Sequence, residues 1–178
     1  LIELIKRKSK GTEMEKVDDI GRLGVMTKEL SNKMRDFIWS LDVKNDTLYD
    51  LIIRLKDFGD DLFYDTSVSF KLSGVDDDLK EIKLSLDWRR HLTLIFKEAM
   101  NNIVKYSKCE NVELKIAKEN KFIKIELLDD GNGFDLLKIK KGNGLRNMKT
   151  RAEYLKAKLA INSKINNGTQ IILEGNIT

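Results

Sequence analysis

The stretch FIKIELLDDGNGF, residues 122–134, combines the two patterns that decide the fold of this chain. Its first half predicts an apolar β-strand from Phe122 to about Leu128. Its second half follows the spacing Asp-x-Gly-x-Gly directly after that strand. Glycine can adopt positive φ and lets a backbone approach a ligand closely. The stretch therefore predicts a strand that ends in either a tight turn or a binding loop.

Helices and strands alternate on both sides of this stretch. On the N-terminal side we expect a helix from 46 to about 62 with Asn45 or Asp46 as its cap, a strand at 68–72, an acidic loop at 76–78, a helix at about 87–106 and a strand at about 112–117. On the C-terminal side we expect a helix at about 145–156 and strands near 159–162 and 170–173 joined by a turn at 166–168. Mixed strands with helices gathered on one side predict an α+β fold, a two-layer sandwich.

The N-terminal residues follow a different pattern. Apolar residues recur at steps of three and four from Val17 to Leu41, which predicts one long amphipathic helix preceded by a capping box at 12–15. Residues 1–8 resemble the last turns of another helix, so the pair is typical of an antiparallel helical hairpin. We expect a domain boundary that separates residues 1–44 from residues 45–178. Because residue 1 is Leu, we also expect the chain to be a piece of a longer protein.

Composition excludes several classes of protein. The chain has 178 residues, of which 33 are Lys or Arg and 29 are Asp or Glu, so its formal charge is only +4. With no basic run longer than three residues, nucleic-acid binding is not expected. No apolar stretch approaches the 18 residues that a membrane span needs. Cys109 is the single cysteine, which favours a reducing, cytoplasmic compartment.

The helix at 87–106 carries a candidate site for a metal-bound phosphate. Glu98, Asn102 and Lys105 fall at i, i+4 and i+7, and therefore on one face. Mg²⁺ prefers oxygen ligands, so the amide oxygen of Asn102 suits it. Glu98 could act as a base, and Lys105 could face a phosphate. The alternative is an ordinary amphipathic helix with a solvated polar face.

Two glycine-containing loops carry the other candidates. Asp129 can accept a hydrogen bond from the amine of adenine, whereas guanine would present another acceptor there. Gly131 and Gly133 are expected to adopt positive φ and allow close approach to a ligand. Gly142 and Gly144 precede a helix whose N-terminus favours phosphate, and residues 135–141 could form a small lid. A simple turn and a simple helix start remain the alternatives.

Taken in order, these motifs resemble the ATP-binding superfamily of gyrase, heat-shock chaperones and histidine kinases. The chain is most similar to the cytoplasmic end of bacterial two-component sensor histidine kinases, in the group of the nitrate sensors and the desaturase thermosensor. The motifs concerned are the N box at 95–107, the glycine boxes at 129–134 and 142–152, Asn167-Gly168-Thr169, and the linker at 38–46.

The resemblance implies a role for each matching residue. Glu98 would be the catalytic acid of the N box, Asn102 would ligate Mg²⁺ and Lys105 would contact phosphate. Asp129 would recognise adenine. The remaining nucleotide-binding residues would be Gly131, Gly133, Gly142, Gly144, Leu145 and Thr169. Residues 1–44 would be part of a dimerisation and phosphotransfer hairpin. ATP would phosphorylate a histidine, which then passes the phosphoryl group to a response regulator.

One departure from the family concerns the acceptor. The family has a His followed by an acidic residue, and this chain has only His91, followed by Leu92. We expect His91 to be a surface or partly packed side chain, and the acceptor helix to be truncated. The parent would then be anchored in a membrane, with this portion in the cytoplasm. A Ser-directed kinase of the anti-sigma type and a dimerising scaffold with a vestigial pocket remain alternatives.

Overall fold

The computed structural model describes residues 21–27, 30, 31, 34, 46–136, 138 and 143–177. The chain divides into two compact units, Leu1–Leu41 and Asp42–Thr178. In the first unit, the described residues are all helical, and the side chains of Met26, Leu30 and Met34 are exposed. The expected helix at residues 1–8, the capping box at 12–15 and the linker up to residue 45 lie outside the described residues.

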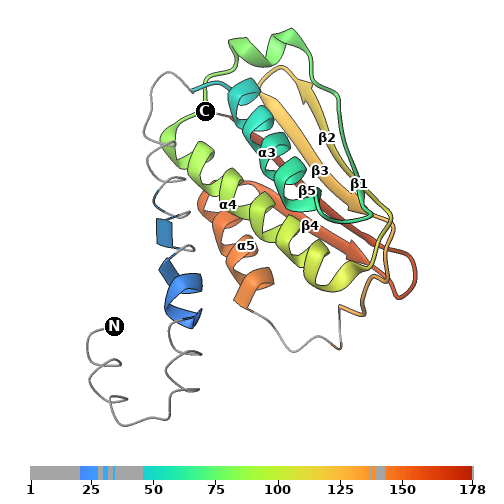
Figure 1. Ribbon diagram of the computed structural model, residues 1–178. Coiled ribbons are helices and arrows are strands. Elements are labelled where there is room, and N and C mark those ends of the chain that lie inside the picture. Colours follow the sequence, from blue (N-terminus) through green and yellow to red (C-terminus); the bar gives the residue numbers. More distant parts are fainter. Residues whose placement is uncertain are drawn as a thin grey trace. The chain divides into compact units, whose positions relative to one another are not determined.

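The second unit is a two-layer α+β sandwich, as the sequence predicts (Figure 1). Among the described residues, one layer holds three helices, α3 (Leu48–Phe63), α4 (Leu86–Asn102) and α5 (Asn143–Tyr154). The other layer is a sheet of β1 (Ser69–Ser73), β2 (Asn111–Glu119), β3 (Phe122–Asp129), β4 (Lys158–Ser163) and β5 (Thr169–Asn176). Two shorter helical turns, η2 (Asp77–Glu81) and η3 (Ile103–Ser107), complete the unit.

The sheet has the strand order β1-β2-β3-β5-β4. The pair β1 and β2 is parallel, and the other neighbouring pairs are antiparallel. In this register Asp129, at the end of β3, pairs with Val112 on one side and with Thr169 on the other. Asp129 and Thr169, which lie 40 positions apart in the sequence, therefore meet where the neighbouring strands β3 and β5 end and begin.

Alternation along β3 separates the two faces of the sheet. Ile123, Ile125 and Leu127 are buried beneath the helices, because a strand turns every second side chain to one face. Lys124 and Glu126 lie on the opposite face, where they form an ion pair. The core is completed by the apolar faces of α3 and α4, whose fully buried side chains include Leu51, Ile52, Leu55, Leu92, Ile95 and Phe96.

The predicted cap of α3 is wrong by one or two residues. Thr47 caps the helix: its hydroxyl oxygen accepts from the Asp50 N–H at 3.1 Å, and the Asp50 carboxylate accepts from the Thr47 N–H at 3.2 Å. This reciprocal pair is a capping box, and it satisfies two backbone donors that a cap at Asp46 would leave free. The carbonyl of Asp46 instead accepts from the N–H of Leu84 at 2.7 Å.

Two short segments differ in conformation from the sequence-based expectation. Residues 77–81 form the 3₁₀ turn η2 rather than an open acidic loop, because Leu79 is buried and pulls the segment onto the domain. Residues 103–107 form the π-helical turn η3, so the helix predicted to reach Tyr106 is α-helical only as far as Asn102.

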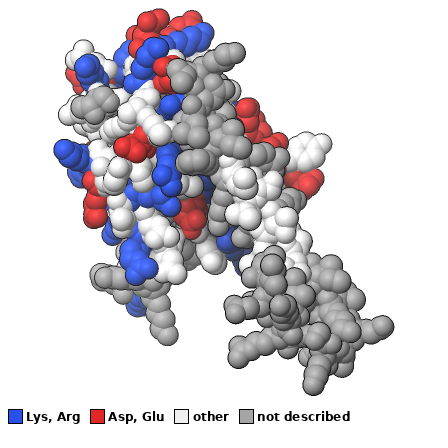
Figure 2. All heavy atoms as spheres, turned by 90° about the vertical axis from the view of Figure 1, so that its left-hand side faces the viewer, with Lys and Arg blue, Asp and Glu red and all other residues white. Residues whose placement is uncertain are grey.

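Charges are distributed as their near balance suggests. On the face seen in Figure 2, basic and acidic side chains are interspersed rather than gathered into a field of one sign. Within the described ranges, no helix combines the length and apolar character needed to cross a bilayer.

Candidate functional site

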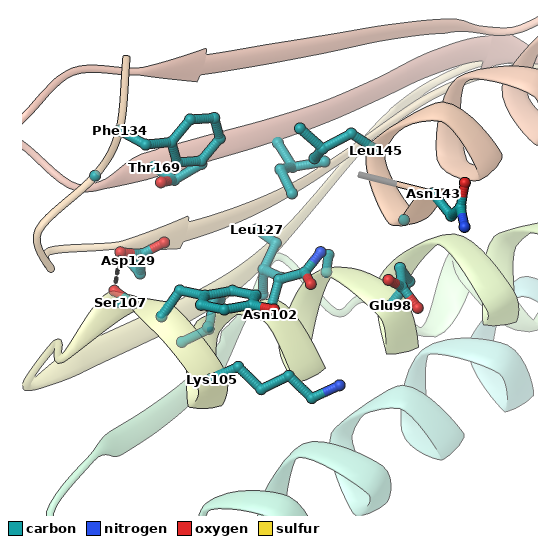
Figure 3. Close-up of a pocket in the computed structure, with 16 residues that line it drawn as sticks. Glu98, Asn102, Lys105, Ser107, Leu127, Asp129, Phe134, Asn143, Leu145 and Thr169 are labelled. Atoms are coloured by element: carbon teal, nitrogen blue, oxygen red, sulfur yellow. Dashed lines mark hydrogen bonds between the residues drawn. The ribbon is translucent and has the colours of Figure 1, made fainter. Parts of the chain in front are cut away.

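A cavity of about 550 Å³ opens between α4, the sheet and the start of α5 (Figure 3). Its volume is in the range usual for small-molecule sites. The residues that line it include most of those singled out from the sequence: Glu98, Asn102, Lys105, Asp129, Gly133, Gly144, Leu145 and Thr169. The fold thus brings together four segments that are separate in the sequence.

Helix α4 presents Glu98 and Asn102 to the cavity. The opposite face of the helix is anchored in the core by Met100, and the Ser85 hydroxyl caps its first turn. Both polar side chains are half-buried, and they lie one helical turn apart as the spacing predicts.

The π-helical turn η3 follows Asn102 and changes the geometry beyond it. Lys105 lines the cavity but is exposed, and in Figure 3 its amino group points away from Asp129. Ser107 is buried at the end of the turn, and Lys108 then takes a left-handed conformation with φ of 53°. The wider turn therefore brings the hydroxyl of Ser107 to the carboxylate of Asp129.

Asp129 is held at the end of β3 by two hydrogen bonds to one oxygen. Its Oδ1 accepts from the hydroxyl of Ser107, shown dashed in Figure 3, and from the N–H of Gly131 at 3.0 Å. Sequence reasoning missed Ser107. The available signal was a short polar side chain just after the polar stripe of the preceding helix, but only the register of β3 shows what it contacts.

The neighbouring Asp130 makes a different set of contacts. Its carboxylate accepts from the N–H groups of Glu110 and Asn111, both at 2.9 Å, and from the side-chain amide of Asn111 at 2.8 Å. These donors, above all those of Asn111, lower the pKa of Asp130 below its ordinary value. Of the two adjacent carboxylates, Asp129 lines the cavity and Asp130 joins two strand ends.

The loop after β3 corrects one expectation about the glycines. Gly133 has φ of +53°, as expected, and a Cβ there would lie 2.1 Å from the carbonyl oxygen of Lys164. Gly131 does not have positive φ. It is needed for another reason, because a Cβ on Gly131 would lie 1.9 Å from the Ser107 hydroxyl. Gly131 therefore allows close packing against Ser107, another part of the protein, rather than a close approach to a ligand.

The turn at 166–168 packs against the same loop. The N–H of Gly168 donates to the Gly131 carbonyl at 2.8 Å, and that of Asn166 donates to the Asn132 carbonyl at 2.6 Å. Gly168 has φ of +65°, and a Cβ there would lie 1.9 Å from the carbonyl oxygen of Asp129. The hairpin turn therefore fixes the loop in place and sets Thr169 at the cavity.

The start of α5 lies against the carboxylate of Glu98. A Cβ on Gly144 would be 2.2 Å from Glu98 Oε1, so a larger residue there would displace the Glu98 carboxylate from its present position. Met148 and Ala152 anchor the helix in the core. The first N–H groups of a helix attract anions, so a phosphate group is suited to this end of the cavity. Gly142 and the two lysines directly before it, Lys140 and Lys141, lie outside the described residues.

Apolar side chains form much of the remaining wall. They are supplied by Ala99 of α4 and Ile103 of η3, by Leu127 and Ile171 of the sheet, by Phe134 of the loop after β3 and by Leu145 of α5. Of these six, only Leu145 was expected at the site, because apolar residues in helices and strands also predict an ordinary core. An apolar wall with one carboxylate at its edge suits an aromatic base that bears an amine.

His91 does not belong to the cavity lining. Its ring packs on that of Tyr154, with centroids 4.6 Å apart, and it is half-buried, as the sequence suggests. Burial, with smaller contributions from Arg151 and Arg90, lowers the pKa of His91.

Comparison with known proteins identifies the region that holds the site. The family model described as histidine kinase-, DNA gyrase B- and HSP90-like ATPase matches residues 89–175. The histidine-protein kinase/phosphatase DegS of Brevibacillus brevis is 33% identical over 111 residues, which is 60% of this chain and 29% of the relative. The sensor histidine kinase LiaS of Bacillus subtilis is 30% identical over 95 residues, 53% of this chain and 26% of the relative. The chain thus spans less than a third of either relative.

Solved structures share the fold. A histidine kinase domain from Erythrobacter litoralis has a TM-score of 0.64 at 12% identity, covering 80% of this chain and 69% of that chain. The histidine kinase AdeS of Acinetobacter baumannii has a TM-score of 0.62 at 13% identity, covering 98% and 90%. At such low identity the likeness concerns the fold alone.

Proposed function

Since residues 89–175 are an ATP-binding catalytic domain of the histidine kinase-, DNA gyrase B- and HSP90-like ATPase family, we propose that this chain is the kinase core of a bacterial two-component sensor. It would bind Mg·ATP and, in the whole protein, phosphorylate a histidine. The observation that carries the proposal is the cavity, which collects Glu98, Asn102 and Asp129 from the matched region.

The base would bind beside Asp129. The carboxylate stands at the edge of an apolar wall and can accept a hydrogen bond from the amine of adenine, which guanine lacks at that position. Thr169 is paired with Asp129 across the strands and would contact the same end of the nucleotide. Gly133 lines this end of the cavity, and Gly131 would shape it through its contact with Ser107.

The phosphates would bind between α4 and the start of α5. Asn102 would ligate Mg²⁺ through its amide oxygen. Over the described ranges no three His, Cys, Asp or Glu side chains could hold a metal by themselves, so the phosphates would supply further ligands. Lys105 would contact phosphate after a change of side-chain conformation, and Gly142, Gly144 and Leu145 would form the phosphate loop. When bound, Mg²⁺ would neutralise part of the negative charge of the ATP phosphates.

Glu98 would act on the acceptor. Its carboxylate lies at the phosphate end of the cavity, against Gly144, where it can accept a proton from an acceptor imidazole. Residues 1–44 would belong to a helical hairpin that forms a homodimer and carries the phosphotransfer site. The exposed apolar stripe of Met26, Leu30 and Met34 supports this assignment, because such a stripe needs a partner. A response regulator would receive the phosphoryl group.

Calorimetric titration with a non-hydrolysable ATP analogue, with and without Mg²⁺, tests nucleotide binding. We expect Mg²⁺-dependent binding that GTP does not reproduce. Absence of binding at millimolar nucleotide would refute the kinase proposal and favour a dimerising scaffold.

The change Asp129→Asn tests the assignment of the base site. The variant should bind the ATP analogue about tenfold more weakly or worse, because an amide N–H then faces the amine of adenine. Asp61→Asn is the matched control, since it makes the same chemical change on an exposed residue of α3. Equal affinities of the two variants would contradict the assignment.

Phosphotransfer needs an added acceptor. We expect the chain to label a histidine-containing helical hairpin supplied in trans, and to do so through acid-labile phosphate. Glu98→Gln should retain nucleotide binding and lose this transfer. An acid-stable product would instead indicate the Ser-directed alternative.

A further inference from the structure

We propose that Ser107 is a positioning residue for Asp129, and that its hydroxyl determines how strongly the site prefers a base with an exocyclic amine. The inference rests on the proposed nucleotide site. It concerns a residue that contacts the carboxylate rather than the ligand.

One carboxylate oxygen of Asp129 accepts both of these hydrogen bonds. The Ser107 hydroxyl and the Gly131 N–H both donate to Oδ1, and no donor from the described part of the chain reaches Oδ2. Two donors on one oxygen fix the plane of the carboxylate. Oδ2 is thereby kept as the acceptor available to a ligand (Figure 3).

Ser107 is itself firmly held. Its side chain is 7% exposed, and its carbonyl accepts from the N–H of Asn132 at 2.7 Å. Gly131 packs directly on it, so that a Cβ there would lie 1.9 Å from the hydroxyl oxygen. The π-helical turn and the left-handed Lys108 end the helix at this point. The hydroxyl therefore has little freedom to move away from Asp129.

Removal of the hydroxyl should act on recognition of the base. With Ser107→Ala, Oδ1 keeps only the Gly131 N–H, and the carboxylate can rotate about its terminal bond. To form a hydrogen bond between Oδ2 and the amine of adenine, the carboxylate must then be fixed in one orientation, which costs conformational entropy. A nucleotide that forms no such hydrogen bond does not require the carboxylate to be fixed.

The experiment measures dissociation constants of the 178-residue chain for ATP and for purine riboside triphosphate, which lacks the amine. Wild type should prefer ATP. In Ser107→Ala the affinity for ATP should fall about fivefold and that for purine riboside triphosphate should change less than about twofold. The ratio of the affinity for ATP to that for purine riboside triphosphate should therefore contract by more than about 2.5-fold. Ser107→Thr keeps a hydroxyl and should restore the ratio.

Ser73→Ala is the matched control. Its hydroxyl also donates to a carboxylate, Glu113 Oε1 at 2.9 Å, but neither residue lines the cavity, and deletion of the hydroxyl should leave the ratio unchanged. Thermal unfolding checks that each variant is folded. If Ser107→Ala does not fold, the Ser107→Thr ratio decides, because a wild-type ratio supports the proposal and a contracted one overturns it.

Two negative outcomes are distinguishable. Equal weakening of both nucleotides in Ser107→Ala, or an unchanged ratio, overturns the role of Ser107 and leaves the nucleotide site intact. Wild type that binds neither nucleotide overturns the proposed function and this inference with it.

Discussion

Asn111 and Asp130 are joined by two hydrogen bonds to the same carboxylate, one from the backbone N–H at 2.9 Å and one from the side-chain amide at 2.8 Å. A third donor, the N–H of Glu110, reaches the carboxylate at 2.9 Å. These bonds tie the start of β2 to the end of β3, directly beside Asp129. The geometry of the cavity edge therefore depends on a carboxylate that does not line the cavity.

Asp130→Ala should lower the free energy of unfolding by about 1–2 kcal/mol, because three donors lose a charged acceptor at a partly solvated site. Chemical denaturation measures it. The pKa of Asp130 is lowered in the folded protein, so its contribution is present above the ordinary value of 3.8 and is lost as the pH falls through the folded pKa. The difference in unfolding free energy between wild type and Asp130→Ala should therefore shrink as the pH falls through the folded pKa. Asp78→Ala, which removes one exposed ion pair with Lys118, should cost less than about 0.5 kcal/mol.

His91 should make the domain less stable in mild acid. Burial places the pKa of His91 below 6.5, so the unfolded chain binds a proton more readily than the folded one. The free energy of unfolding should therefore fall as the pH drops from 6.5 toward the folded pKa, and this group should contribute no slope well above 6.5. His91→Phe keeps a ring against Tyr154 and removes the titration. Urea unfolding between pH 5 and pH 8 should show a flatter profile for the variant, and an unchanged slope would contradict this role.

Gly133→Ala should destabilise the domain and weaken nucleotide binding together. The residue has φ of +53°, which costs about 1–2 kcal/mol for an L side chain, and the added Cβ meets the carbonyls of Lys164 and Gly168. We expect a loss of at least that size in unfolding free energy. Gly21→Ala is the control, since its Cβ would meet nothing within 4 Å. A Gly133→Ala variant as stable as wild type would refute the packing argument.

Most of the fold was predictable because it depends on local patterns. The strand ending at Asp129, the helix containing Glu98 and the helix after Gly142 follow from periodicity and glycine placement, and the structure has them within a few residues. The cap of α3 was misplaced because Asn45, Asp46 and Thr47 all favour that role. The choice was made by the side chain of Asp50, which completes a reciprocal pair only with Thr47.

The composition of the site was also predictable in part. Spacing alone placed Glu98 and Asn102 on one face, and the cavity contains both. Positive φ was expected for Gly131, whereas the structure shows that glycine is needed there because Ser107 packs against it. A sequence does not show that the nearest neighbour of a glycine is a residue from another element. Ser107 was missed for the same cause.

The sequence by itself determined the order of helices and strands, the loops that end at the site and most of the polar residues that line it, because these depend on neighbours within one or two turns. Only the tertiary structure decided the strand order β1-β2-β3-β5-β4, the parallel pairing of β1 with β2, the alignment of Asp129 with Thr169 and the contact of Ser107 with Asp129. These features depend on burial and on backbone pairing between segments that are distant in the sequence. Because alternative pairings of those segments differ only in the packing of the whole core, no short stretch of sequence predicts which pairing forms.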